Sequence, residues 1–265
     1  MASVPQTGVD RTVSIGRVFS RGFGTIGSNP VATLGISFLF GALPSVLFIY
    51  AFQSLQQQSF DEFGVLAGFV SGLVAMVVGL VVYAITQGAL VRATVAHSQG
   101  RVAGFAESAK AGATVIVPLL LVAVISGLGV VLGLLFLLVP GLMLLCIWAV
   151  ATPAVVEERS GPLAALSRSS DLTRGARWKI FGLFLVLFVL QWLLAAIYGV
   201  LTAAVFSVDL NDPGAGGSTL AFFAMQAVVE TVSAAVSGVV LASLYVELRD
   251  WKDGPAVETL ADVFS

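Results

Sequence analysis

A single acidic residue, Glu230, lies in the middle of a long apolar segment in the last fifth of the chain. Gln226 and Ser233 fall on its face if the segment is helical, because side chains three and four residues apart lie one above the other. A charged side chain at the centre of a bilayer costs about 2.5–3.5 kcal/mol on insertion scales, so Glu230 should face the protein interior or water. Gln87 and Gln191 are the other deep polar side chains, and we expect them to be its hydrogen-bond partners.

Two interpretations of this intramembrane group remain open. The group is either a neutral network that packs helices together or a site that takes up a proton or a substrate. No Lys or Arg lies at a similar depth, so we expect the Glu230 carboxyl to be protonated or hydrated.

A second set of titratable residues lies where an apolar segment ends at Glu157-Glu158-Arg159. The basic stretch that follows contains Arg168, Arg174 and Arg177. One interpretation is a solvated helix end. The alternative is that an acidic residue pairs with Arg174 or Arg177 and holds the basic stretch in place.

Other motifs point away from catalysis and from metal binding. Cys146 is the only cysteine, which excludes a disulfide within the chain, and His97 is the only histidine. We expect Cys146 to be a buried small apolar residue and His97 to lie at a helix end. The stretch 209–214 contains two aspartates but too few ligands for a calcium loop. The sequence therefore predicts no catalytic residues, no metal site and no cofactor.

The elements that hold these residues are membrane-spanning helices. Only 11% of the residues are charged, against about 25% in soluble domains, so the apolar excess must face lipid. A helix needs about 20 apolar residues to cross a bilayer, and Pro140-Gly141 divides a run that is too long for one crossing. We expect a kink at Pro44 and six spans, at Val31–Gln53, Phe63–Leu90, Thr114–Val139, Leu142–Val156, Ile180–Phe206 and Thr219–Val246.

The basic residues indicate the orientation of these spans. All 13 Lys and Arg residues lie in the N-terminal segment, the second-to-third connection, the fourth-to-fifth connection or the C-terminal tail. The alternate connections carry only acidic residues, Asp61, Glu62, Asp209 and Asp212, or none. Cytoplasmic loops are enriched in Lys and Arg, so we expect both termini to be cytoplasmic in a bacterial inner membrane.

A short basic segment precedes each odd-numbered span, near residues 12–28, 101–111 and 162–174. In the first, Ile15, Phe19, Phe23 and Ile26 recur at helical spacing. This pattern predicts helices at the cytoplasmic membrane surface, although ordinary polar linkers are the alternative. We expect one all-α domain over residues 1–254, followed by a short cytoplasmic tail at 255–265.

Several motifs carry a resemblance to a known group of proteins. These are residues 15–21, Val155-Val156-Glu157, residues 161–169, residues 172–175 and residues 244–249. With them, the chain resembles the bacterial YciC-like membrane proteins and the membrane domain fused to some glycerophosphodiester phosphodiesterases, over roughly residues 12–254. The resemblance implies a helical membrane domain and no catalytic residues. The phosphodiesterase activity belongs to a separate soluble domain and is not carried over.

These observations favour a non-enzymatic membrane protein with a structural, envelope-related or regulatory role. A small transporter or channel that uses Glu230 is the alternative, and a protein that binds or modifies lipid headgroups is the third. The expected partners are the bilayer, anionic lipids at the cytoplasmic face, and a second copy or another membrane protein, but no nucleic acid.

Overall fold

The computed structural model describes residues 13–49, 64–206 and 219–254, and these residues form helices and no strands. Six of the helices are long and apolar enough to cross a membrane, which confirms the six-span, all-α architecture. They are Pro30–Ile49, Gly72–Ser98, Ile116–Phe136, Leu138–Glu158, Arg177–Ala204 and Ala221–Lys252. The predicted acidic connections, including the stretch 209–214, lie outside the described residues, as does the tail at 255–265.

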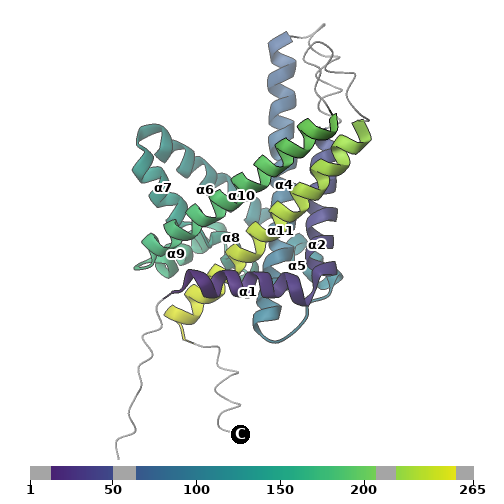
Figure 1. Ribbon diagram of the computed structural model, residues 1–265. Coiled ribbons are helices and arrows are strands. Elements are labelled where there is room, and N and C mark those ends of the chain that lie inside the picture. The colour runs from purple at the N-terminus through teal and green to yellow at the C-terminus, as the bar shows by residue number, and fades with distance from the viewer. Residues whose placement is uncertain (1–12, 50–63, 207–218, 255–265) are drawn as a thin grey trace, which may run out of the picture.

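Figure 1 shows how the spans are arranged. The first span joins α2 (Pro30–Ile36), the π-helix η1 (Ser37–Ala42) and helical residues 43–49. The remaining spans are formed by α4 (Gly64–Ser98), α6 (Ile116–Phe136), α7 (Leu138–Ile147) with α8 (Ala151–Glu158), α10 (Arg177–Phe206) and α11 (Thr219–Lys252).

The first span is wound more widely just before Pro44. A proline has no N–H and its ring clashes with the carbonyl four residues earlier, which here belongs to Phe40. Phe40 lies within η1, whose π-helical turns move that carbonyl out of the usual hydrogen-bond register. The expected disturbance at Pro44 therefore takes the form of a π-helical segment ahead of it.

The break between the third and fourth spans lies earlier than predicted. Leu137 has an extended backbone (φ −159°, ψ 136°) between α6 and α7. Pro140 and Gly141 lie inside the first turn of α7, so the predicted division at these two residues was wrong. A first-turn proline needs no intrahelical hydrogen bond, and Gly141 lets the hairpin close because a Cβ atom there would lie 2.5 Å from Leu134.

Short helices precede spans one, three and five, as predicted. They are α1 (Ile15–Ser28), α5 (Phe105–Thr114) and α9 (Pro162–Thr173). In Figure 1, α1 lies across the lower end of α11, and α5 and α9 lie at that same end of the bundle. The largest buried cluster is centred there and includes Val18 of α1, Leu172 of α9 and Tyr245 of α11.

Burial differs strongly among the spans. The most apolar 18-residue window is 56% buried in α11 but only 11% buried in α6 and 17% buried in α10. Helix α11 is therefore the central helix, whereas α6 and α10 turn long apolar surfaces outward, as expected of helices that face lipid.

Helix α5 docks closely on α4 through two glycines. A Cβ atom at Gly88 would lie 2.7 Å from the Cα of Gly112, and one at Gly112 would lie 2.7 Å from the Ile85 carbonyl oxygen. Such small-residue contacts are the usual way in which membrane helices approach each other.

Candidate functional site

A cavity of about 280 Å³, lined by several polar side chains, lies between the first span, α4 and α11. Helix α11 contributes Glu230, Ser233 and Ser237 to its wall, and Glu230 is half-buried there. The first span contributes Gly41 and Ser45, and α11 also contributes Ala234. The residues from α4 are Gly79, Val82, Tyr83, Thr86 and Gln87. A water molecule takes about 30 Å³ in the liquid, so the cavity has room for several waters or one small solute.

Glu230 and Gln87, the acidic and the amide side chain of this cavity, have no partner among the described residues. The carboxylate of half-buried Glu230 forms no hydrogen bond and no ion pair there, and no Lys or Arg lines the cavity. The amide of Gln87, only 5% exposed, likewise forms no hydrogen bond to a described residue. Buried polar groups are normally paired, so both groups are available to waters or to a bound solute.

The structure brings three of the four predicted intramembrane residues to this region, but with different contacts from those expected. Gln87 shares the cavity wall with Glu230 without a hydrogen bond between them. Gln191 of α10 binds α11 instead: its Nε2 donates to Ser237 Oγ at 2.7 Å, and Ser233 Oγ donates to its Oε1 at 2.7 Å. The predicted hydrogen bonds of Gln87 and Gln191 to Glu230 were therefore wrong, and Gln226 does not line the cavity.

The serines give Gln191 an indirect part in the site. Ser233 and Ser237 both line the cavity on one side and are held by Gln191 on the other. Gln191 therefore positions the cavity wall and does not itself reach the cavity.

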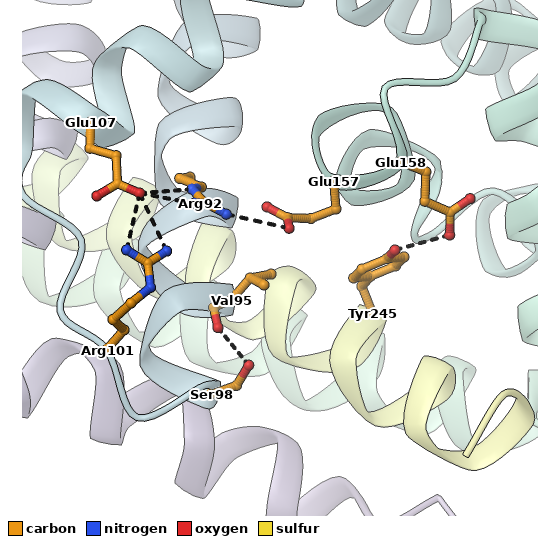
Figure 2. A network of polar contacts seen from close by, with 8 residues as sticks. All are labelled: Arg92, Val95, Ser98, Arg101, Glu107, Glu157, Glu158 and Tyr245. Atoms are coloured by element: carbon orange, nitrogen blue, oxygen red, sulfur yellow. Dashed lines mark hydrogen bonds and ion pairs between the residues drawn. The ribbon is translucent and has the colours of Figure 1, made fainter. Parts of the chain in front are cut away.

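At the opposite end of α11, the candidates Glu157 and Glu158, predicted to lie on the cytoplasmic side, contact different helices (Figure 2). Glu157 lies 3.7 Å from Arg92 of α4. Glu158 accepts hydrogen bonds from Tyr245 Oη at 3.0 Å and from Arg168 Nε of α9 at 2.8 Å. Acidic residues do hold the third short helix, but through Arg168.

Arg174 and Arg177 form no ion pair among the described residues, so the predicted pairing of these two with Glu157 or Glu158 was wrong. They line a second cavity, beside α7 and α10. Arg168 also pairs with Asp253, and this hydrogen bond raises the pKa of its guanidinium.

The second short helix is held by Glu107, which Figure 2 shows between two arginines. Arg92 Nη2 donates to its Oε1 at 2.9 Å, and Arg101 Nη2 lies 3.4 Å from the same oxygen. The hydrogen bond from Arg92 lowers the pKa of the Glu107 carboxyl, with a smaller contribution from Arg101. Arg92 thus contacts both Glu107 and Glu157 and links α5 to the end of the fourth span.

The first short helix is held by Glu247 of α11, which is 6% exposed. Arg17 Nε donates to its Oε1 at 2.8 Å, and Arg21 Nη1 lies 3.7 Å from its Oε2. The backbone N–H of Ser14 donates to the same carboxylate at 3.3 Å. The hydrogen bond to Glu247 raises the pKa of the Arg17 guanidinium. His97, at the end of α4 as predicted, contacts Ser28 Oγ at 3.1 Å.

Sequence reasoning missed part of each site. Tyr83 lies one helical turn before Gln87, a spacing that places both on one face and could have identified it. Glu247 is an acidic residue among the basic ends of the spans, and the excess of nearby arginines could have marked it as their partner. The closeness of Ser45 to α11 depends on the wide turns of η1 and has no sequence signal.

Neither region resembles a metal centre. Among the described residues, no three His, Cys, Asp or Glu side chains gather closely enough to hold a metal ion. Cys146 is 4% exposed, as expected of a buried small apolar residue. Comparisons of the chain with protein-family models, curated proteins and solved structures found no match.

Proposed function

We propose that this multi-pass membrane protein is a small transporter or channel that binds a proton or a small monovalent cation at Glu230. The observation that carries the proposal is the Glu230 carboxylate, which lines the cavity between the first span, α4 and α11 and has no hydrogen-bond or ion-pair partner among the described residues. An acidic group retained at membrane depth is expensive, and such groups commonly mark ion and proton pathways.

The chemistry of the cavity wall supports this class of ligand. Ser45, Ser233, Ser237 and Gln87 line the same cavity as the carboxylate and bring further side-chain oxygen atoms to its wall. These groups can replace the water shell of a small cation or relay a proton through waters. No Lys or Arg among the described residues lines the wall, so none of their charges competes with a cation for the carboxylate.

Flux into vesicles tests the proposal. The full chain is reconstituted in liposomes, a membrane potential is applied, and entrapped dyes report entry of protons or Na⁺. The wild type should show flux above that of empty liposomes, and Glu230→Gln should abolish it because the titratable charge is lost. Gln226→Ala is the matched control: it lies one turn away on the same helix, outside the cavity, and should keep the flux. Equal flux in the wild type and Glu230→Gln would contradict the proposal.

We also propose the orientation: a bacterial inner membrane with both termini cytoplasmic. The short helices α1, α5 and α9 lie at one end of the bundle, and with them the arginines that bind Glu107, Glu158 and Glu247 (Figure 1). Reporter fusions after Arg101 and Arg249 should be cytoplasmic, and fusions at Gln57 and Ala215 should be external. A cytoplasmic signal at Ala215 would overturn this topology.

The second candidate is a non-enzymatic structural or regulatory role, which the ion pairs between the short helices and the spans favour. In this case the helices α1, α5 and α9 form a surface for a membrane-protein partner or a second copy. Loss of flux in Glu230→Gln separates the two candidates, because this substitution leaves the ion pairs of Glu107, Glu158 and Glu247 intact. The resemblance to the YciC-like proteins remains a proposal, and no activity is drawn from it.

A further inference from the structure

A second cavity of about 540 Å³ lies between α7 and the start of α10. Its wall is mostly apolar, with Leu142 and Met143 on α7 and Trp178 and Phe181 on α10. Arg174 and Arg177 also line it. The volume falls within the range of sites that bind small organic ligands, roughly 300–1,000 Å³.

The two arginines at this cavity differ from the arginines that hold the short helices. Arg17, Arg21, Arg92, Arg101 and Arg168 each lie within 4 Å of a carboxylate. Arg174 and Arg177 have no such partner among the described residues. The Nε of Arg177 is buried and forms no hydrogen bond there. Two guanidinium groups that line the cavity and have no carboxylate partner in the described part of the chain suit an anion.

The apolar residues that line the cavity include side chains on the outer surface of the bundle. Trp178 is 86% exposed and Met143 is 46% exposed. The surrounding faces of α6 and α10 are largely apolar and outward-facing. A tryptophan and arginines at a helix end are typical of the level of the lipid headgroups. The cavity therefore combines two arginines with exposed apolar side chains at the start of a membrane-spanning helix.

We propose that the cavity between α7 and α10 binds one anionic phospholipid, with its phosphate on Arg174 and Arg177 and an acyl chain along Leu142, Met143 and Phe181. Arginine forks match phosphate oxygens, and the apolar wall matches the chain. The lipid lies in the leaflet on the basic side of the protein. This site is separate from the Glu230 cavity, and the inference does not depend on the proposed flux.

Fluorescence quenching of Trp178 tests the proposal. The full chain is reconstituted in phosphatidylcholine vesicles with an increasing share of phosphatidylglycerol, and one of the two lipids carries brominated acyl chains. The signal of Trp178 is the difference between the wild type and Trp178→Phe. Brominated phosphatidylglycerol should quench it at a much lower mole fraction than brominated phosphatidylcholine, by about fivefold for each arginine that contacts the phosphate.

Variants that remove positive charge test whether the preference for phosphatidylglycerol depends on Arg174 and Arg177. In the double variant Arg174→Gln with Arg177→Gln, both brominated lipids should quench the fluorescence of Trp178 equally. Lys179→Gln is the matched control: it removes one positive charge from an exposed residue of α10 that does not line the cavity, and it should keep the preference. A preference that survives in the double variant would overturn the proposal.

The wild type alone also decides the question if the double variant does not fold. Equal quenching by both lipids would show that the groove has no headgroup selectivity, and absence of quenching by either would show that a second copy or another protein covers it. Relief of quenching by inorganic phosphate would show that the arginines recognise phosphate without the acyl chain. Each of these three results would overturn the proposal.

Discussion

Helix α11 carries two interior glutamates with opposite surroundings. Glu247, at the basic end of the bundle, is 6% exposed and receives contacts from Arg17, Arg21 and the backbone of Ser14. Glu230, deeper in the same helix, lines a cavity and has no such partner among the described residues. A glutamate carboxylate is therefore fully paired at position 247 and has no partner among the described residues at position 230.

The difference separates a structural carboxylate from a candidate binding group. A buried polar group without a partner costs about 1–3 kcal/mol, more when charged, and a leucine would remove that cost. Burial of Glu247 is offset by arginines that fasten α1. Burial of Glu230 is offset by no contact within the described part of the chain, so a ligand, a proton or water must supply the compensation. The predictions below test this division, beginning with the largest effect on stability.

Glu247→Gln should destabilise the protein by about 1–2 kcal/mol, because it leaves Arg21 without its buried partner. The estimate is at the low end since the Arg17 side chain is 56% exposed and water screens its charge. In this variant, the backbone amides of α1 should exchange faster than in the wild type, whereas those of α10 should not. Unchanged protection of α1 would mean that the apolar contacts of Val18 alone hold this helix.

Gln191→Leu should destabilise the protein less, by about 0.6 kcal/mol and at most about 1.7 kcal/mol, the measured range for hydrogen bonds between membrane helices. It removes the hydrogen bonds to Ser233 and Ser237 and so loosens one wall of the Glu230 cavity. Flux should fall only partly, because the carboxylate remains. A complete loss of flux with a fully stable protein would place Gln191 in the pathway itself.

Glu107 gives the smallest stability effect and a pH dependence. Its folded pKa lies below the ordinary value of 4.5, mainly through the hydrogen bond from Arg92, so the contact is present above that value and is lost as the pH falls through the folded pKa. After correction for the intrinsic pH dependence of amide exchange, the protection of α5 should therefore fall in acid. In Glu107→Gln the protection should be lower at neutral pH and lack this acid step. An identical acid step in the variant would assign the effect to another carboxylate.

The spans could be predicted because apolar length and basic residues are local signals. The run 111–156 contains two spans, but the break moved to Leu137, since Pro140 is tolerated in a first turn and Gly141 closes the hairpin. The sequence predicted only a kink at Pro44. The structure instead has the π-helix η1, because the hydrogen-bond register adjusts to the proline over several preceding residues.

The side-chain partners were much less predictable than the spans. Depth along a helix can be read from the sequence, and it placed Gln87 and Glu230 at one level. Hydrogen bonds also depend on how helices rotate and cross, and these placed Gln191 behind Ser233 and Ser237. For the same reason Glu158 pairs with Arg168 and not with Arg174, because α9 turns the Arg168 side chain toward Glu158.

Glu230→Gln should leave the free energy of unfolding nearly unchanged and Glu230→Leu should raise it, in contrast to the loss expected in Glu247→Gln. Neither substitution breaks a hydrogen bond or ion pair to a described residue, and leucine removes a buried polar group. Thermal unfolding of the reconstituted protein measures the difference. A strong destabilisation by Glu230→Leu would show that the carboxyl is a packing element of the bundle.

The most direct test compares the two glutamates within one molecule. A hydrophobic carbodiimide reacts with accessible protonated carboxyls, and mass spectrometry of the labelled wild type reports both sites at once. We predict labelling of Glu230, slowed by Na⁺ if the cavity binds a cation, and little labelling of Glu247 behind its arginines. Equal labelling of the two, or labelling of Glu247 alone, would contradict the assignment of Glu230 as the open binding group.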